Sequence, residues 1–184
     1  MYYISADCHF SHWNIIKYCN RPFKSVGEMN DTIIKNFNSV IKPDDIFYNL
    51  GDFCMGDKYD YIASLINRLN GRKVFIRGNH DKVKILNQLK EDKLIEDWHD
   101  IFATYINGQY IVMCHYPMRS WDKSSHGSWH TFGHVHSRFD NNNYGLSCDV
   151  GVDSWNYFPV SFDMLSKKMA LRKAELEATQ EIII

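Results

Sequence analysis

Residues 73–81 read KVFIRGNHD, an apolar run that passes directly into a polar GNHD segment. Such a run is typical of a buried strand, and the glycine marks the point where the strand ends. The same junction recurs where residues 2–6 meet DCH and where residues 46–50 meet GD. Helical patterns separate these runs, so their order predicts a mostly parallel sheet. Ligands of such sheets gather beyond the carboxyl ends of the strands, where these polar segments fall.

The remaining pattern completes an α+β layout. Ser25 and Glu28 form the sequence signature of a capping box before an amphipathic helix, and Asn107-Gly108 predicts a tight β-hairpin. We expect helices at 13–18, 26–40, 58–69, 82–89 and 161–178, and strands at 2–6, 46–50, 73–77, 101–106, 109–114, 129–133 and 145–151. One domain over residues 1–184 with two layered sheets is the simplest account. Three alternatives are open for the apolar tail at 181–184: it forms an edge strand, it frays, or it contacts a partner.

Chemically similar side chains follow the strand runs. Asp7 and His9 stand two residues apart, and on extended backbone their side chains would point the same way. His115, and then His134 with His136, follow later strand runs. Singly each signal is weak, because an aspartate also suits a turn and a lone histidine also suits a core. Together, the carboxylates, imidazoles and one amide are ligands of small divalent metals, and they predict a two-metal hydrolytic site.

The charge of such a site favours an anionic substrate. Two divalent ions carry four positive charges, and two carboxylates neutralise two of them. The remaining charge of roughly +2 would attract a phosphate ester. We expect attack by a metal-bound hydroxide, with Asp52 as the bridging carboxylate between the ions. His80 adjoins Asn79 and is expected to remain unligated and to protonate the departing oxygen, with Asp81 orienting its ring. The alternative is that His80 and Asp81 simply begin a helix.

The ordered set D-x-H, GD, GNHD, H and GHxH, which runs from Asp7 to His136, resembles the calcineurin-like metallophosphoesterase family. The resemblance implies a four-layer αββα sandwich with two mixed β-sheets around a dinuclear centre. It implies that one ion is held by Asp7, His9, Asp52 and His136, and the other by Asp52, Asn79, His115 and His134. His80 would be the catalytic histidine and Asp81 its partner. Manganese is our first expectation for the two divalent ions, with iron, zinc, nickel or cobalt as alternatives.

The chain resembles the small, uncapped bacterial and phage members of that family. This resemblance implies a metal-dependent phosphoesterase, with phosphodiesters or cyclic nucleotides slightly preferred because an open site leaves room for flanking groups. The substrate could then be a nucleotide or a nucleic-acid end. A phosphomonoesterase or a small nucleotide pyrophosphohydrolase is the second hypothesis. A non-catalytic scaffold of the same fold is the third, and the presence of His80 argues against it.

Four residues outside the motifs are candidates for substrate contact: His12, Arg21, Trp121 and His126. His12 and Arg21 follow the first motif closely, and a guanidinium can bind phosphate oxygens in bidentate fashion. A structural ion pair is the alternative for Arg21. Trp121 and His126 lie in a polar loop between two ligand motifs, where Trp121 would stack on a base or simply be packed.

Composition sets the remaining bounds. The formal net charge of −1 gives no support for broad binding to nucleic acid or to an anionic membrane. A local basic rim around the site could still be formed by Arg21, Lys24, Arg119, Lys123 and Arg138. The five cysteines lack CxxC spacing, which favours a reducing compartment and cysteines that fill the core. No signal peptide and no membrane-spanning run is evident, so we expect a cytoplasmic protein without a membrane partner. The sequence leaves a monomer and a small homo-oligomer equally open.

Overall fold

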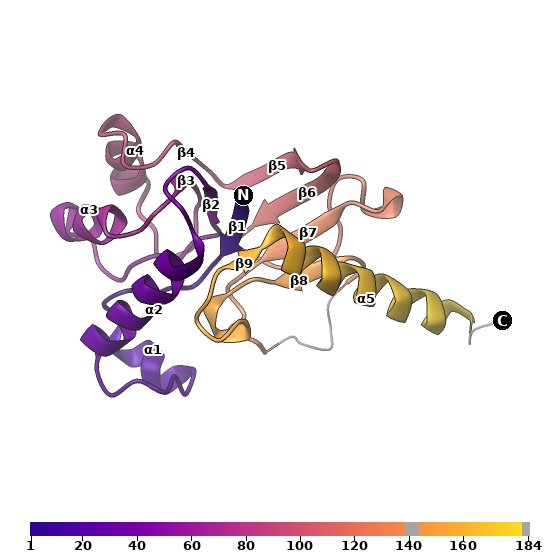
Figure 1. The fold of residues 1–184 in the computed structure, drawn as a ribbon, viewed down its shortest axis with the longest axis horizontal. Coiled ribbons are helices and arrows are strands. Elements are labelled where there is room, and N and C mark those ends of the chain that lie inside the picture. Colours follow the sequence, from indigo (N-terminus) through magenta and orange to yellow (C-terminus); the bar gives the residue numbers. More distant parts are fainter. Residues whose placement is uncertain (139–143, 182–184) are drawn as a thin grey trace.

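The first of two mixed sheets carries the strands that the N-terminal motifs follow. The computed structural model describes residues 1–138 and 144–181 and is shown in Figure 1. The strand order of this sheet is β4-β3-β2-β1-β9. Its members are β1 (Tyr2–Ser5), β2 (Ile46–Asn49), β3 (Arg72–Ile76), β4 (Asp97–His99) and β9 (Val160–Ser161). Strands β1 to β4 are parallel and β9 is antiparallel to β1, so β1, β2 and β3 end at the same edge.

The second sheet begins with the predicted hairpin. Its strands, in the order β5-β6-β7-β8, are β5 (Ile101–Ile106), β6 (Gln109–Cys114), β7 (Trp129–Phe132) and β8 (Ser147–Asp149). Asn107 and Gly108, both with positive φ, form the turn between antiparallel β5 and β6, as a two-residue hairpin of this type requires. Strands β7 and β8 continue the sheet in parallel with β6.

Helices flank the two sheets. Helices α1 (Trp13–Tyr18), α2 (Val26–Val40), α3 (Tyr59–Asn67) and α4 (Val83–Glu91) gather on one side of the molecule, and α5 (Phe162–Glu181) lies on the other (Figure 1). Two short 3₁₀ segments, Ser124–His126 and Val152–Ser154, complete the described elements. The predicted α+β class with two mixed sheets is confirmed.

The N-cap predicted at Ser25 is present at the start of α2, although Glu28 reaches back to Lys24 and not to Ser25 itself. The Ser25 hydroxyl accepts a hydrogen bond from the backbone N–H of Glu28 at 3.1 Å, and the Glu28 carboxylate accepts one from the N–H of Lys24 at 2.7 Å. Each bond satisfies a backbone donor near the first turn, which has no partner within the helix itself. Local side-chain chemistry therefore sets the first residue of this helix.

Two hydrophobic cores lie on the two faces of the first sheet. The helix-facing core contains Phe37 of α2 and Phe47 of β2, whose ring centroids are 5.4 Å apart, and both are fully buried. The core between the sheets contains Ile4 and Met113, and Leu165 of α5 packs into it. The two sheets are thus joined by a continuous apolar layer that ends at the carboxyl ends of β1 to β3.

Short strands are where the sequence-based expectations differ from the structure. Strands β4 and β9, of three and two residues, were not predicted, because so few residues carry no readable alternation. The strand expected at 145–151 covers only Ser147–Asp149. Four of the five cysteines are buried, and none of the five, all within the described ranges, forms a disulfide, as expected for core fillers. Of the tail considered at 181–184, Glu181 ends helix α5, and residues 182–184 lie outside the described residues.

Within the described ranges, no helix combines the length and the apolar character that crossing a membrane would require.

The ring of Phe47 offers a direct test of the helix-facing core. Replacing Phe47 with alanine should lower the free energy of unfolding by about 3–5 kcal/mol, because the fully buried ring would leave a cavity against Phe37. Chemical denaturation followed by circular dichroism measures this change. Tyr105→Ala is the matched control, since its ring is 61% exposed and its removal should cost less than about 0.5 kcal/mol. Equal losses in the two variants would contradict the packing described here.

Candidate metal centre

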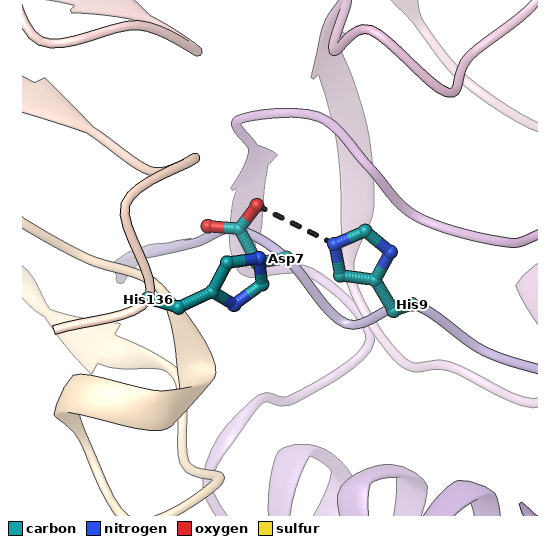
Figure 2. A group of neighbouring side chains, drawn as sticks. All are labelled: Asp7, His9 and His136. Atoms are coloured by element: carbon teal, nitrogen blue, oxygen red, sulfur yellow. Dashed lines mark ion pairs between the residues drawn. The ribbon is translucent and has the colours of Figure 1, made fainter. Parts of the chain in front are cut away.

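The predicted ligands lie in two adjoining groups at the seam between the sheets. Ligand atoms of Asp7, His9 and His136 all lie within 4.8 Å of one another, and so do those of Asp52, His115 and His134. Figure 2 shows the first group, in which the Asp7 carboxylate lies next to the His136 ring and a dashed line marks its contact with the His9 ring. Compared with the two ligand sets implied by the family resemblance, the first group lacks Asp52 and the second lacks Asn79. Asp52 lies near His9 of the first group, and Asn79 lies beside His115 of the second.

The strand ends are tied together by the backbone. The N–H of Asp7 donates to the carbonyl of Gly51 at 3.0 Å, and the N–H of His9 donates to the carbonyl of Asp52 at 2.9 Å. These bonds extend the pairing of β1 and β2 beyond the last strand residues. They hold the two candidate carboxylates side by side in space although 45 positions separate them in the sequence.

The local backbone at these positions is left-handed, which corrects one premise of the sequence reasoning. Asp7 and His9 do contribute to one group, but their φ angles are +57° and +49°, so they are not on extended backbone. Asp52, His134 and His136 also have positive φ, at +53°, +71° and +49°. Such conformations cost roughly 1–3 kcal/mol each for residues other than glycine and cluster at functional sites. The strands therefore end before the ligands, and tight turns aim the side chains.

Two glycines make room for the carboxylates. A Cβ added at Gly78 would lie 2.2 Å from Oδ1 of Asp52, and one at Gly133 would lie 2.4 Å from Oδ2 of Asp7. No real Cβ tolerates such contacts, so any larger residue would displace the acid it touches. The glycines in the GNHD and GHVH segments are thus required by close packing against the two aspartates.

Asp7 and His9 present unpartnered polar atoms to the first group. Oδ2 of Asp7 accepts a hydrogen bond from the N–H of His134 at 2.7 Å, whereas Oδ1 of Asp7 and Nε2 of His9 have no hydrogen-bond partner although both are buried. Burial raises the pKa of Asp7 to about 7 and lowers that of His9 to about 2. A buried acceptor and a neutral imidazole nitrogen without partners fit a bound cation, which would satisfy both.

Asp52 lies between the two groups. Its Oδ2 is 3.5 Å from Nε2 of His115 and 3.6 Å from Nε2 of His9, and its Oδ1 accepts a hydrogen bond from the N–H of His80 at 2.8 Å. Burial by itself would raise the pKa of Asp52, but His115 and the N–H of His80 lower it to about 2. The carboxylate is therefore anionic and faces ligand atoms from both groups.

The orientation of the His115 ring is fixed by a hydrogen bond to a backbone carbonyl. Its Nδ1 donates to the carbonyl of Leu50 at 2.8 Å, and its Nε2 lies 3.1 Å from Oδ1 of Asn79. Because a carbonyl only accepts, the proton stays on Nδ1, and Nε2 faces Asp52 and Asn79. Burial works against the charged ring, yet the Asp52 carboxylate raises the pKa of His115 in the metal-free protein. A backbone carbonyl behind the ring is the usual support of a metal-binding histidine.

Asp153 supports His136 in the same way, and sequence reasoning missed it. Its Oδ2 accepts a hydrogen bond from Nδ1 of His136 at 2.7 Å. Burial tends to lower the pKa of His136, but Asp153 raises it to about 10. The signal was present, because Asp149 is the last residue of strand β8 and Asp153 follows it, much as the other acids follow their strands. Asp149 accepts hydrogen bonds from the N–H groups of Gly151 and Ser137 and so shapes the turn around the site.

Arg21 requires a correction. It was a candidate phosphate contact, but its side chain is fully buried and pairs bidentately with Asp153, with both N–O distances at 2.8 Å. It also donates to the backbone carbonyls of Asp7 and Cys8. With these donors engaged inside the protein, the guanidinium is a structural ion pair, which was the alternative. It braces the turn that carries Asp7 and His9.

Asp81 also differs from its predicted role. Its carboxylate accepts hydrogen bonds from the backbone N–H groups of Asp52, Phe53 and Gly78, at 2.9, 3.2 and 2.8 Å. Burial raises its pKa, and these N–H donors oppose that effect. Asp81 therefore fixes the two turns after β2 and β3 and does not pair with the His80 ring. His80 is positioned by its own N–H bond to Asp52.

Of the three other candidates for substrate contact, His12 lies at the site, whereas Trp121 and His126 lie away from it. His12 lines a cavity of about 390 Å³ together with His9, Asp52 and His80. Trp121 is only 8% exposed, so it is packed rather than available to stack on a base, and its ring centroid lies 5.2 Å from that of His130. His126 lines a different depression, beside Tyr105 and Lys123. Of the five residues proposed for a basic rim, only Arg138 lines the cavity at the site.

The fold and the clustered ligands define the class of metal-dependent hydrolases, and comparison with known proteins names the family. The chain belongs to the calcineurin-like phosphoesterase family, whose profile matches residues 2–158. This family is metal-dependent and acts on phosphate esters.

Three similar proteins cover most of the chain. An uncharacterized protein of Methanocaldococcus jannaschii, MJ1445, is 40% identical over 171 residues, which are 90% of this chain and 89% of that protein. The gene 66 protein of Mycobacterium phage L5 is 24% identical over 83% of this chain and 86% of its own length. The crystal structure of AQ665, a protein of unknown function from Aquifex aeolicus, aligns with a TM-score of 0.71 at 26% identity and covers 91% of this chain and 98% of its own.

The raised pKa of Asp7 predicts how the metal-free protein responds to pH. Between its unfolded value of 3.8 and its folded value of about 7, the native state holds a proton that the unfolded chain has lost. Stability must therefore fall as pH rises through this window. The free energy of unfolding of the EDTA-treated protein, measured relative to that of Asp7→Asn, should decline from pH 4 to pH 7. A difference that stays constant over this range would contradict burial of the Asp7 charge.

Proposed function

We propose that the protein hydrolyses phosphodiesters at a dinuclear centre. The observation that carries the proposal is the pair of ligand groups that meet at Asp52, whose Oδ2 lies within 3.6 Å of imidazole nitrogens from both. One site would be formed by Asp7, His9, Asp52 and His136, and the other by Asp52, Asn79, His115 and His134. Two ions spaced so that one carboxylate can bridge them are typical of phosphoester hydrolysis.

The donor set decides the class of cation. Carboxylate, amide oxygen and imidazole suit Mn²⁺, Fe²⁺ and related ions, with Mn²⁺ as our first choice. Cys8 and Cys54, next to ligands in the sequence, belong to the helix-facing core and offer no thiolate. When bound, the two ions would polarise the phosphoryl oxygens and lower the pKa of water near neutrality.

His80 is the residue that we assign to proton transfer. Its side chain is 37% exposed, it lines the cavity at the site, and its Nε2 lies 3.8 Å from Oδ2 of Asp52. Its ring meets that of His9 edge-on, with centroids 5.3 Å apart. An exposed imidazole at this position can give its proton to the oxygen that departs from phosphorus. Because His9, Asp52 and His80 also come close enough to share an ion, the test must separate a proton donor from a ligand.

Diesters are favoured over monoesters by two cavities that adjoin Asn79. One cavity of about 390 Å³ and another of about 440 Å³ both include this residue in their lining. A diester carries two substituents that need such room, whereas a monoester carries one. A phosphomonoesterase or nucleotide pyrophosphohydrolase is the alternative. The metal-loaded protein should hydrolyse bis-p-nitrophenyl phosphate faster than p-nitrophenyl phosphate, and the reverse order would favour the alternative.

Asp52→Asn tests the bridging carboxylate. Loss of one negative charge shared by two ions should reduce metal content and activity together. Metal analysis after dialysis against Mn²⁺, combined with the rate on bis-p-nitrophenyl phosphate, measures both. A variant that keeps two ions per chain at full occupancy would show that Asp52 does not bridge.

His80→Ala tests the proton donor. It should keep both ions yet lose about 10²- to 10⁴-fold in rate, most strongly with a poor leaving group that needs protonation. Substrates that differ only in the pKa of the departing alcohol separate this effect from general damage. If metal content falls with the rate, His80 is a ligand, and if a poor leaving group departs at the wild-type rate, the proton donor lies elsewhere.

A further inference from the structure

The two cavities that meet at Asn79 differ in chemistry. The first is lined by His12, His80 and Arg138, together with the metal-ligand candidates His134 and His136. Besides the Asp52 carboxylate, its lining includes the imidazole of His80 and the guanidinium of Arg138, which can donate hydrogen bonds or protons. His80, the proposed proton donor, lines this cavity and not the second. A departing oxygen would therefore meet its proton on the first side.

The second cavity has no free cation among its described lining residues. Arg77 is held by Asp100, with Nε 2.7 Å from Oδ1, so the pair is close to neutral as a unit. Ile101 and Tyr116 line the same cavity and are 56% and 45% exposed. An exposed isoleucine and an exposed aromatic ring beside a neutralised arginine form a surface suited to a flat, uncharged group.

Tyr116 links this cavity to the candidate ligands. Its ring centroid lies 5.0 Å from that of His115 and 4.8 Å from that of His134, both in edge-on contact. These two contacts hold the ring, and Tyr116 remains 45% exposed. A ring held in this way loses little conformational freedom when a planar group stacks on it.

We propose that Tyr116 is a specificity-determining residue that stacks on the nucleobase or aryl group of the retained half of a phosphodiester. The leaving group then occupies the cavity of His12, His80 and Arg138. The substrate class is a nucleoside phosphodiester bound across Asn79. This inference rests on the proposed phosphodiesterase function and adds the direction in which the substrate lies.

The reaction balances with this orientation. The oxygen of water bonds to phosphorus, and the bond from phosphorus to the oxygen on the His80 side breaks. That oxygen takes a proton from His80 and leaves as an alcohol. One proton of the water restores His80, and the other stays on the phosphate or passes to solvent. The nucleoside on the Tyr116 side keeps the phosphate as a monoester.

Two substrates with one leaving group test the inference. The wild-type protein, loaded with Mn²⁺, is assayed on thymidine 5′-(p-nitrophenyl phosphate) and on methyl p-nitrophenyl phosphate, which lacks a base. The nucleoside ester should have a kcat/KM about tenfold higher, as expected for one base stacked on an aromatic ring. Tyr116→Ala should abolish most of this preference through KM, and Tyr116→Phe should retain it. Tyr105→Ala, an exposed tyrosine that lines a separate depression, should leave the preference unchanged.

The outcomes separate the two proposals. If neither ester is hydrolysed, the phosphodiesterase function is wrong and the inference falls with it. If both are hydrolysed equally well by the wild type, or Tyr116→Ala slows both by the same factor, the function stands and the assignment of Tyr116 is overturned. A loss of preference in Tyr105→Ala as large as in Tyr116→Ala would also overturn it. Metal content and thermal unfolding of each variant confirm that the centre and the fold are intact.

Discussion

The burial of Asp7 and Asp52 beside one another is the constraint on which this structure depends. Both carboxylates are almost inaccessible to water, and the strands β1 and β2 that carry them are neighbours. Two adjacent buried anions are unfavourable unless positive charge or donors compensate them. In the metal-free protein the compensation comes from histidines and backbone N–H groups, and Asp7 responds with a pKa raised to about 7. A cation bound at this seam would compensate the buried carboxylates, so these residues fit a metal ion.

Further buried charges maintain the strained backbone around these acids. Asp81 binds three N–H groups from the turns after β2 and β3, and Asp153 joins Arg21 to His136. Left-handed residues such as Asp7 and His136 persist only where the surroundings determine their conformation. Asp81 and Asp153 are not proposed metal ligands. They hold the turns that direct the ligand carboxylates and imidazoles toward the proposed ions.

The fold and the candidate ligands were largely predictable because each ligand sits next to a strand end in the sequence. Parallel pairing then brings Asp7, Asp52 and Asn79 to one edge without any knowledge of side-chain packing. Contacts between remote segments were not predictable in this way. Arg21 and Asp153 are 132 positions apart, and nothing in either local sequence distinguishes a buried ion pair from a phosphate contact. The direction of the Asp81 side chain likewise depends on turns whose left-handed residues have no signature beyond the neighbouring glycines.

The division of the ligands between the two sheets joins folding to chemistry. Asp7, His9 and Asp52 follow strands of the first sheet, whereas His115, His134 and His136 follow strands of the second. Each ligand group contains members from both, so neither group exists until the apolar layer containing Ile4 and Met113 brings the sheets together. A cation bound at the seam would contact both sheets and stabilise their packing, because it binds the folded arrangement and not the unfolded chain. Core packing and metal affinity are therefore linked quantities in this protein, and a substitution deep between the sheets acts on both.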